Sequence, residues 1–339
     1  MSKCELSVVF DQPERMYKLG EPISGKVQVL PNTDFACRKI TLVVGWRTHG
    51  RGNHASGGDD EMILAAEEKF RADEVKEFPF QFAARRGPLS YHGTYLNVEW
   101  YLRAQMDIPV AADVIKEEKF LLVPGETSEE ILLGSEEQVQ AEESAETTRA
   151  FRERMTMAKI LAVPFVVIGI IMIYTAGTHP LALAISLAVT GFGAWQLFIM
   201  LRNKLAQQKL GKVEVEIEPK RVHAGKQVEC KFLFRSQDLQ RLNKITATLK
   251  GVERVASGSG DLKRTYTHTV YEATIEQTNA SAVAAGNNKM LINLPLQIPS
   301  TAPTTFYAPD NALVWSIRVQ IDVPDWPDWV QEFPITVIP

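Results

Sequence analysis

One loop in the first half of the chain carries residue types that bind metal ions. His49 and His54 lie in a glycine-rich stretch that also contains Asp59 and Asp60. Zinc takes imidazole and carboxylate ligands, but a site needs three or four of them held in fixed positions. The corresponding stretch of the second half, residues 255–261, is also rich in Gly and Ser but has no histidine. We therefore expect a mobile connector between two strands and no metal site.

Motifs of the common enzyme classes are missing from the sequence. It has no Gly-x-Ser-x-Gly, no His-Glu-x-x-His and no phosphate loop with Gly-Lys-Ser/Thr. The remaining histidines are isolated. We predict a chain that is not an enzyme, with no catalytic residues and no cofactor. The formal net charge of −4 gives no basic footprint for nucleic acid.

Three cysteines indicate the redox environment. Cys4, Cys37 and Cys230 are scattered and odd in number. This pattern fits reduced thiols in the cytoplasm better than a disulfide framework or a paired metal-ligand set.

Two apolar segments dominate the middle of the chain. Residues 160–176 and 181–201 contain no Asp, Glu, Lys or Arg, and a short turn at residues 177–180 separates them. Helices of this length rise about 1.5 Å per residue and can each span roughly 25–30 Å of hydrocarbon. A buried hairpin of a soluble protein is the alternative, but the segments are apolar on every helix face. We predict a two-helix transmembrane hairpin over residues 159–202.

The charges around the hairpin predict its orientation. The flanking basic residues expected at the membrane surface are Arg149, Arg152, Arg154, Lys159, Arg202 and Lys204. The turn has no Lys or Arg, and basic residues stay on the cytoplasmic side. We therefore expect both termini and both flanking regions in the cytoplasm, with the turn at residues 177–180 outside. The inverted topology is the alternative.

Small residues recur in the second apolar segment. Ala182, Ser186, Thr190 and Ala194 are four positions apart and fall on one helix face. Such a face allows close packing against the first segment near Gly169. It would equally allow a homodimer within the membrane.

The regions on either side of the hairpin have the pattern of β-strands. Residues 5–124 and 212–339 alternate apolar and polar positions in short runs that Gly, Pro and Asn interrupt. Residues 126–146 are acidic and contain no basic residue, which is typical of a solvated linker. We predict a β-sandwich over 1–125, an acidic linker and basic juxtamembrane segment over 126–158, the hairpin over 159–202 and a second β-sandwich over 203–339.

The two β regions repeat one another. Residues 100–109, WYLRAQMDIP, correspond to residues 315–324, WSIRVQIDVP, and segments 39–42 and 78–82 correspond to 244–247 and 294–298. Shared Trp, Arg, Gln, Asp and Pro in one register indicate an internal duplication. Trp100 and Trp315 fall on the apolar face of their strands, where we expect them to anchor the two cores.

Two further tryptophans lie where the first unit has none. Trp326 and Trp329 belong to the stretch VPDWPDW, which corresponds to residues 110–114. Tryptophan on a hairpin tip could contact a partner or the membrane interface. Packing on the lip of the sandwich is the alternative.

Several motifs together resemble the arrestin-like superfamily. They are residues 17–27, YKLGEPISGKV, followed by 78–80, 88–91 and 98–104, and by 298–299, 315–322 and 332–337 in the second unit. The resemblance implies a mainly β fold, in which two tandem antiparallel sandwiches of arrestin N-like and C-like type flank the inserted hairpin.

The same resemblance implies a non-catalytic adaptor or scaffold that binds membrane-protein tails or cytosolic partners. Sheet edges could take up an extended peptide as an added strand. The alternative is a structural protein that organises membranes by self-assembly.

Overall fold

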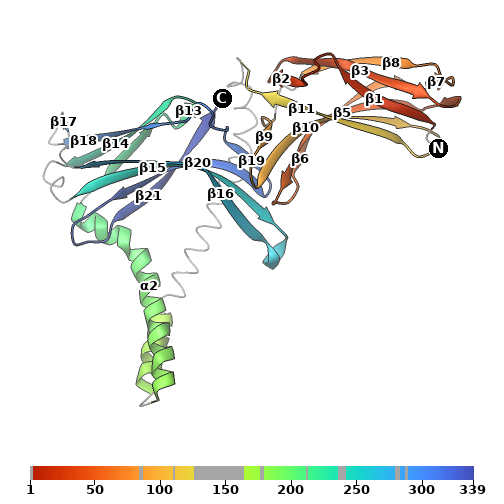
Figure 1. Ribbon diagram of the computed structural model, residues 1–339. Coiled ribbons are helices and arrows are strands. Elements are labelled where there is room, and N and C mark those ends of the chain that lie inside the picture. Colours follow the sequence, from red (N-terminus) through yellow and green to blue (C-terminus); the bar gives the residue numbers. More distant parts are fainter. Residues whose placement is uncertain are drawn as a thin grey trace.

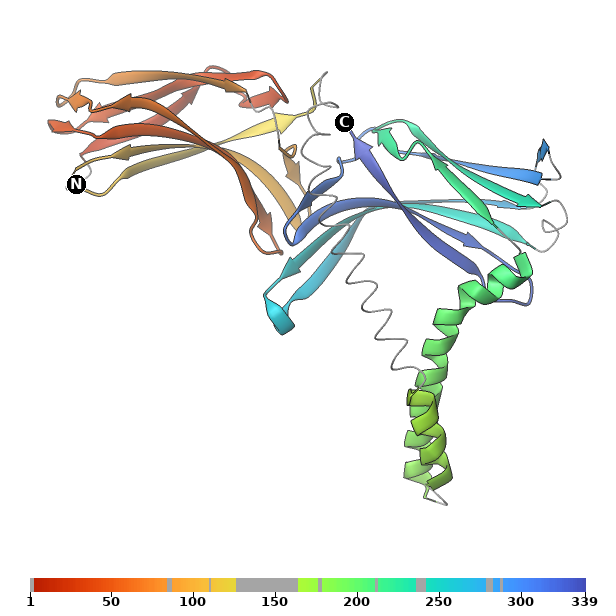
Figure 2. The same cartoon turned by 180° about the vertical axis from the view of Figure 1, so that it is seen from behind.

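The computed structural model describes residues 3–83, 87–109, 111–125, 164–175, 179–210, 213–235, 242–278, 283–286 and 289–339. Within these residues the chain forms two β-sandwiches, and helices project from the second sandwich (Figure 1). The opposite view shows the same separation between sandwiches and helices (Figure 2). The prediction of a mainly β, sandwich-based fold is confirmed.

The first sandwich consists of two facing sheets in the order β1-β3-β8 and β2-β11-β10-β5-β6, with β9 paired to β10 and a small β4-β7 pair. Its strands are β1 (Cys4–Phe10), β2 (Met16–Lys18), β3 (Pro22–Pro31), β4 (Phe35–Ala36), β5 (Lys39–Gly50), β6 (Ser56–Ala66), β7 (Lys69–Phe70), β8 (Lys76–Ala83), β9 (Tyr91–His92), β10 (Leu96–Asp107) and β11 (Val114–Val123).

The second sandwich repeats this order, with β12-β14-β18-β17 facing β13-β21-β20-β15-β16 and β19 paired to β20. Its elements are β12 (Glu214–Glu218), β13 (Arg221–His223), β14 (Gln227–Arg235), β15 (Lys244–Ser257), the short helix η2 (Gly260–Leu262), β16 (Arg264–Thr278), β17 (Val283–Gly286), β18 (Lys289–Gln297), β19 (Phe306–Ala308), β20 (Asn311–Ile321) and β21 (Trp329–Ile338).

Strand alternation places one apolar face of each sheet in a core. In β10, Trp100, Leu102, Ala104 and Met106 are each 2% exposed or less. Side chains of a strand point alternately to opposite faces, so one strand fills the core with every second residue. In β20, Trp315 is 1% exposed and begins the equivalent series.

The duplication extends to individual hydrogen bonds. Trp100 Nε1 donates to the carbonyl oxygen of Pro88 at 2.7 Å, and Trp315 Nε1 donates to that of Pro303 at 3.0 Å. Each tryptophan thus fills a core and fixes the irregular segment before β9 or β19. Burying an indole requires a partner for its N–H, and both units use the same one.

The helical part consists of an apolar helix over Pro164–Thr175 and of α2 (Pro180–Leu210). One described helix is long and apolar enough to cross a membrane, α2 over Pro180–Phe198, and only 11% of that segment is buried. The helix continues beyond the expected end at residue 201. Ala206 and Leu210 are fully buried in the core of the second sandwich. The linker over 126–158 lies outside the described residues.

The expected mobile connector over residues 47–60 is wrong for most of its length. β5 continues to Gly50 and β6 begins at Ser56, so a shorter loop joins them. The two strands remain paired at Arg47 and Ser56. This loop contacts the second sandwich through Asn53.

Candidate functional site

The two sandwiches meet through loops that occupy equivalent places in the repeat. The side chain of Asn53, between β5 and β6, donates to the carbonyl oxygen of Gly258 at 2.9 Å, and the Gly258 N–H donates back to Asn53 Oδ1 at 3.0 Å. Gly258 lies between β15 and β16. Asn53 Nδ2 also donates to Asp310 Oδ2 at 2.7 Å, and Asn311 Nδ2 donates to the Asn53 carbonyl at 2.7 Å. One asparagine therefore links its loop to two turns of the other sandwich.

A buried carboxylate makes the reciprocal contact. Glu253 in β15 is 0% exposed. Its Oε1 accepts the Tyr91 hydroxyl at 2.7 Å and the Thr94 N–H at 3.0 Å, and its Oε2 accepts the Tyr95 N–H at 2.7 Å. All three donors belong to the first sandwich. A buried carboxylate is tolerated when several hydrogen bonds satisfy it, and here they all cross the interface.

The same contact perturbs Tyr91. Burial, together with the hydrogen bond to Glu253, raises the pKa of Tyr91 above its ordinary value. The phenol therefore stays protonated and keeps donating to the carboxylate.

Two glycines allow the close approach of the sandwiches. A Cβ at Gly93 would collide with Glu253 Oε1. A Cβ at Gly52 would lie 2.9 Å from Val255 and would also overlap the side chain of Asn311. Any side chain at these positions would push the interface apart.

A cation and aromatic rings close one side of the interface. The Arg51 guanidinium lies 3.9 Å from the ring centroid of Tyr266 and 5.1 Å from that of Tyr95. The Tyr95 ring packs edge-on against His268. Each Arg–aromatic contact contributes about 0.5–1 kcal/mol when exposed.

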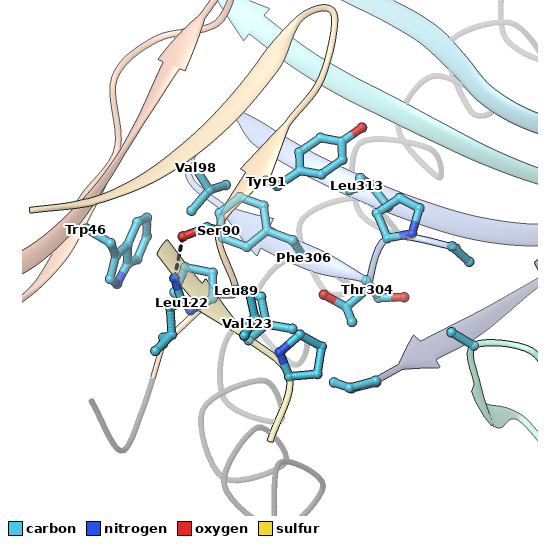
Figure 3. A pocket seen from close by; sticks show the side chains of 18 of the residues that line it. Trp46, Leu89, Ser90, Tyr91, Val98, Leu122, Val123, Thr304, Phe306 and Leu313 are labelled. Carbon is cyan, nitrogen blue, oxygen red and sulfur yellow. Dashed lines mark hydrogen bonds between the residues drawn. The ribbon is translucent and has the colours of Figure 1, made fainter. Parts of the chain in front are cut away.

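On another side of the interface lies a cavity of about 760 Å³ (Figure 3). The first sandwich contributes Trp46, residues 87–91, Val98 and residues 122–124. The second contributes Ala224, residues 300–307, Leu313 and Pro339. Largely apolar cavities of this size between domains are typical ligand-binding places.

The walls of the cavity are related by the repeat. Ser90 and Thr305 are equivalent positions before β9 and β19. The Leu122 N–H donates to Ser90 Oγ at 2.9 Å, as the dashed line in Figure 3 shows, and the Val337 N–H donates to Thr305 Oγ1 at 2.8 Å. Trp46 meets Phe306 edge-on, with ring centroids 5.9 Å apart.

The two loop histidines have partners other than a metal ion in the structure. His49 Nε2 lies 2.8 Å from Glu99 Oε1, and His54 Nδ1 lies 3.0 Å from the carbonyl oxygen of Thr48. Among the described residues no group of three His, Cys, Asp or Glu side chains could hold an ion.

The two hairpin-tip tryptophans separate. Trp329 is 4% exposed and belongs to the core of the second sandwich, whereas Trp326 is 40% exposed. The partner-contact hypothesis for Trp329 is therefore corrected, because β21 begins at Trp329 and its inward register buries the ring. Trp326 stays a candidate contact residue.

The small residues of α2 face the other apolar helix. A Cβ at Gly169 would collide with Thr190, and Ser186 is 0% exposed. Ala182 is half-buried, but Ala194 is exposed, and Gly193 lies on the packed side instead. A helix has 3.6 residues per turn, so the packed face passes through Ser186, Thr190 and Gly193 and does not include Ala194.

Most of the basic residues expected at the membrane surface are not among the residues that the structure describes. Arg149, Arg152, Arg154 and Lys159 lie outside the described residues. Arg202 and Lys204 lie in α2, and their side chains are outside the description.

The interdomain contacts were missed at the level of the sequence, although one signal was present. Residues 245, 247, 249, 251, 253 and 255 share the inward face of β15. Glu253 is the charged member of this series, and a charge on an inward face requires partners. Asn53 gave no comparable signal, because a glycine-rich loop has no fixed register.

Comparisons with known proteins add little. No protein-family model matches the chain, and no curated protein matches it by sequence. Among solved structures, the crystal structure of Spo0M, a sporulation control protein from Bacillus subtilis, is similar with 10% sequence identity and a TM-score of 0.32, over 83% of this chain and 92% of that chain. At this TM-score the similarity carries no inference.

Proposed function

We propose that the chain is an integral membrane adaptor of the arrestin-like superfamily, in which a helical hairpin holds two cytoplasmic β-sandwiches beside the bilayer to bind protein tails or soluble partners. The observation that carries the anchor is the apolar outer surface of the helices. Its large side chains, each at least 46% exposed, are Val167, Ile168, Ile170, Ile171, Tyr174, Leu181, Ile185, Leu187, Phe192, Trp195, Phe198 and Leu201. An exposed apolar surface this continuous calls for lipid or protein to cover it.

The helices also pack against each other inside this surface. Phe165 and Phe192 meet edge-on, with ring centroids 5.7 Å apart, and Gly169 and Gly193 lie against the opposite helix. Small residues inside and large apolar residues outside are the arrangement of packed helices in a membrane.

The anchor connects directly to the second sandwich. α2 runs without interruption from Pro180 to Leu210, and its end is buried in the sandwich core. The helix bends as it approaches the sandwich (Figures 1 and 2), but no loop interrupts it, so the hairpin and the second sandwich are joined directly. The first sandwich follows through the interface at Glu253 and Asn53.

Sheet edges offer places for a partner. β16 and β6 are the end strands of their sheets. An end strand presents unpaired backbone groups along one side and can accept an extended peptide by β-augmentation. This mode needs no catalytic group and suits short tails of other proteins.

Self-assembly as the main function receives less support. The face of small residues on α2 that could pair two hairpins is already packed within one chain. Gly169 lies against Thr190, and Ser186 is buried. At Gly191, by contrast, a Cβ would meet no atom within 4 Å, and this glycine lies on the outer side.

Carbonate extraction tests the anchor. The full chain should remain in the membrane pellet at alkaline pH, because its apolar surface is in lipid. Ile171→Lys combined with Leu187→Lys should shift it to the supernatant, since each charge near a bilayer centre costs about 2.5–3.5 kcal/mol. Leu262→Lys is the matched control, because Leu262 is 80% exposed outside the hairpin. Release of the unmodified chain by carbonate would refute the anchor.

Two glycine variants separate internal packing from dimerisation. Gly193→Leu should destabilise the hairpin by about 1–3 kcal/mol through overpacking, because a Cβ there would lie 2.8 Å from Val166 N. Gly191→Leu should be neutral. Thermal unfolding and crosslinking of the detergent-solubilised chain measure both. Loss of a crosslinked dimer in Gly191→Leu alone would favour self-assembly instead.

Proximity labelling from the C-terminus in living cells tests the adaptor role. Cytoplasmic proteins other than this chain should be labelled reproducibly. Labelling of copies of this chain alone, or of extracytoplasmic proteins, would overturn the role or the topology respectively.

A further inference from the structure

We propose that the cavity between the sandwiches binds a neutral, largely apolar small molecule that carries a carbonyl or ether oxygen. This inference is independent of the membrane anchor. It follows from the charge, the shape and the hydrogen-bonding capacity of the cavity walls.

The side chains of the cavity walls carry no charge. None of the described residues that line the cavity is Asp, Glu, Lys, Arg or His, although charged residues make up 23% of the chain. A charged ligand would lose part of its hydration without gaining a charged side chain as a partner, which is unfavourable. These side chains therefore select against phosphates and carboxylates.

The deep part of the walls is apolar and aromatic. Leu89, Val98, Leu122 and Leu313 are buried there, and Trp46 and Phe306 form an edge-on pair at the wall (Figure 3). Such walls fit a flat or branched hydrocarbon body by contact alone. The volume of about 760 Å³ admits a molecule of one or more aromatic rings.

One hydroxyl group supplies a directed contact. Ser90 and Thr305 each accept one backbone N–H, and within the described part of the chain this is the only hydrogen bond of either hydroxyl. A hydroxyl has one hydrogen to donate besides its acceptor positions. Thr305 is only 2% exposed, whereas Ser90 is partly exposed, so the Ser90 hydroxyl is the one that can donate its hydrogen to a ligand oxygen.

Fluorine NMR on the full chain in nanodiscs tests the proposal with three probes of similar size. 4-Fluoroacetophenone is neutral with a carbonyl acceptor, 4-fluorotoluene is neutral without one, and 4-fluorobenzoate is anionic. The ketone should show saturable line broadening. The toluene should bind about two- to tenfold more weakly for want of one hydrogen bond. The benzoate should bind at least about tenfold more weakly than the ketone, because its charge finds no partner.

Substitutions locate the binding. Ser300→Trp places a large ring at the exposed mouth of the cavity and should abolish the saturable broadening, whereas Ser259→Trp, on an exposed turn elsewhere, should leave it unchanged. Ser90→Ala should weaken the ketone but not the toluene, and Ser90→Thr should retain ketone binding. Broadening that persists in Ser300→Trp belongs to lipid and counts against the cavity.

Equal binding of benzoate and ketone would overturn the proposed ligand class. Absence of saturable broadening by every probe would overturn the site. If Ser90→Ala fails to fold because Leu122 N–H loses its acceptor, Ser300→Trp still decides the location.

Discussion

The two sandwiches share a scaffold but differ at the residues that face each other. Besides the paired indole contacts, Gln105 Nε2 donates to Asp113 at 2.9 Å, and Gln320 Nε2 donates to Asp328 at 2.7 Å. Side-chain contacts that hold irregular segments on the sheet are thus retained in both copies. Residues that the two sandwiches share stabilise the common fold. Residues that differ give each sandwich its own contacts.

Thr48 and Glu253 are the sharpest difference. Thr48 lies opposite Val98, and Glu253 lies opposite Leu313, in equivalent strand pairs. The Thr48 hydroxyl accepts the Ala55 N–H at 2.9 Å and so closes its own hairpin loop. Glu253 is longer and reaches the other sandwich. One change of side chain at the same scaffold position converts an internal contact into an interdomain contact.

The largest expected effects test the shared part of the comparison. Trp100→Ala and Trp315→Ala should each lower the free energy of unfolding of their own sandwich by about 3–5 kcal/mol, because each leaves a large cavity and an unpaired carbonyl oxygen. Pulse proteolysis in urea, with fragments assigned to each half by mass spectrometry, measures the two sandwiches separately.

Trp326→Ala is the control for these variants, since an exposed ring should change the free energy of unfolding by less than about 0.5 kcal/mol. Trp329→Ala should resemble the core variants. If Trp100→Ala destabilised both halves equally, the sandwiches would fold as one unit and the comparison of two scaffolds would fail.

The next largest effect tests the difference. Glu253→Thr gives the second sandwich the residue that the first has at this position. It leaves the Tyr91 hydroxyl and two backbone N–H groups without their acceptor, so we expect a loss of roughly 2–4 kcal/mol from the interdomain contact. Hydrogen exchange at the amides of Thr94 and Tyr95 should accelerate accordingly.

Glu253→Gln keeps the shape and one carbonyl acceptor, and it should give an intermediate rate. Thr48→Val should leave the exchange of Thr94 and Tyr95 unchanged, because it removes a bond within the β5–β6 loop. Unchanged exchange in Glu253→Thr would show that the carboxylate does not hold the interface.

The repeated strands could be predicted from the sequence because two independent signals agree on them. Period-two alternation fixes the inward face of residues 100–109, and the matching segment 315–324 repeats it in the same register. The interface could not be predicted in this way. Two of the three donors to Glu253 are the backbone N–H groups of Thr94 and Tyr95, which carry no information in side-chain type.

The tip tryptophans show a different limit. Residues 324–329 alternate Pro, Asp and Trp, and a sequence of this kind does not show where the loop ends and the strand resumes. β21 resumes at Trp329, so its ring turns inward and Trp326 stays out. A shift of one residue would have reversed the face.

The smallest expected difference between the two sandwiches is in how acid changes their stability, through the ion pairs on their outer faces. In the first sandwich, Glu117 accepts from Arg47 at 2.7 Å and from Arg103 at 3.1 Å, and its side chain is 25% exposed. Burial raises the pKa of Glu117, but the hydrogen bonds from the two guanidinium groups more than offset it, so the pKa lies below its ordinary value. Burial also raises the pKa of Glu99, but hydrogen bonds from Lys119 and His49 more than offset it, so this pKa is lowered too.

The second sandwich has more exposed pairs. The hydrogen bond from Lys231 lowers the pKa of Glu218, and that from Lys244 lowers the pKa of Glu276, but these carboxylates are 55% and 52% exposed. Solvent and salt weaken exposed pairs. We therefore expect the first sandwich to depend more strongly on pH.

A carboxylate with a lowered pKa in the folded state stabilises that state above the unfolded pKa, near 4.5, and the contribution disappears as pH falls through the folded value. Urea midpoints of both sandwiches should hold between pH 7 and about pH 5, and the first should then fall more steeply towards pH 3. Glu117→Gln with Glu99→Gln should flatten that fall, since neither amide titrates. An equal fall in both sandwiches, or no flattening in the double variant, would show that the outer ion pairs do not distinguish the two copies, and the difference between them would then reside at the interface alone.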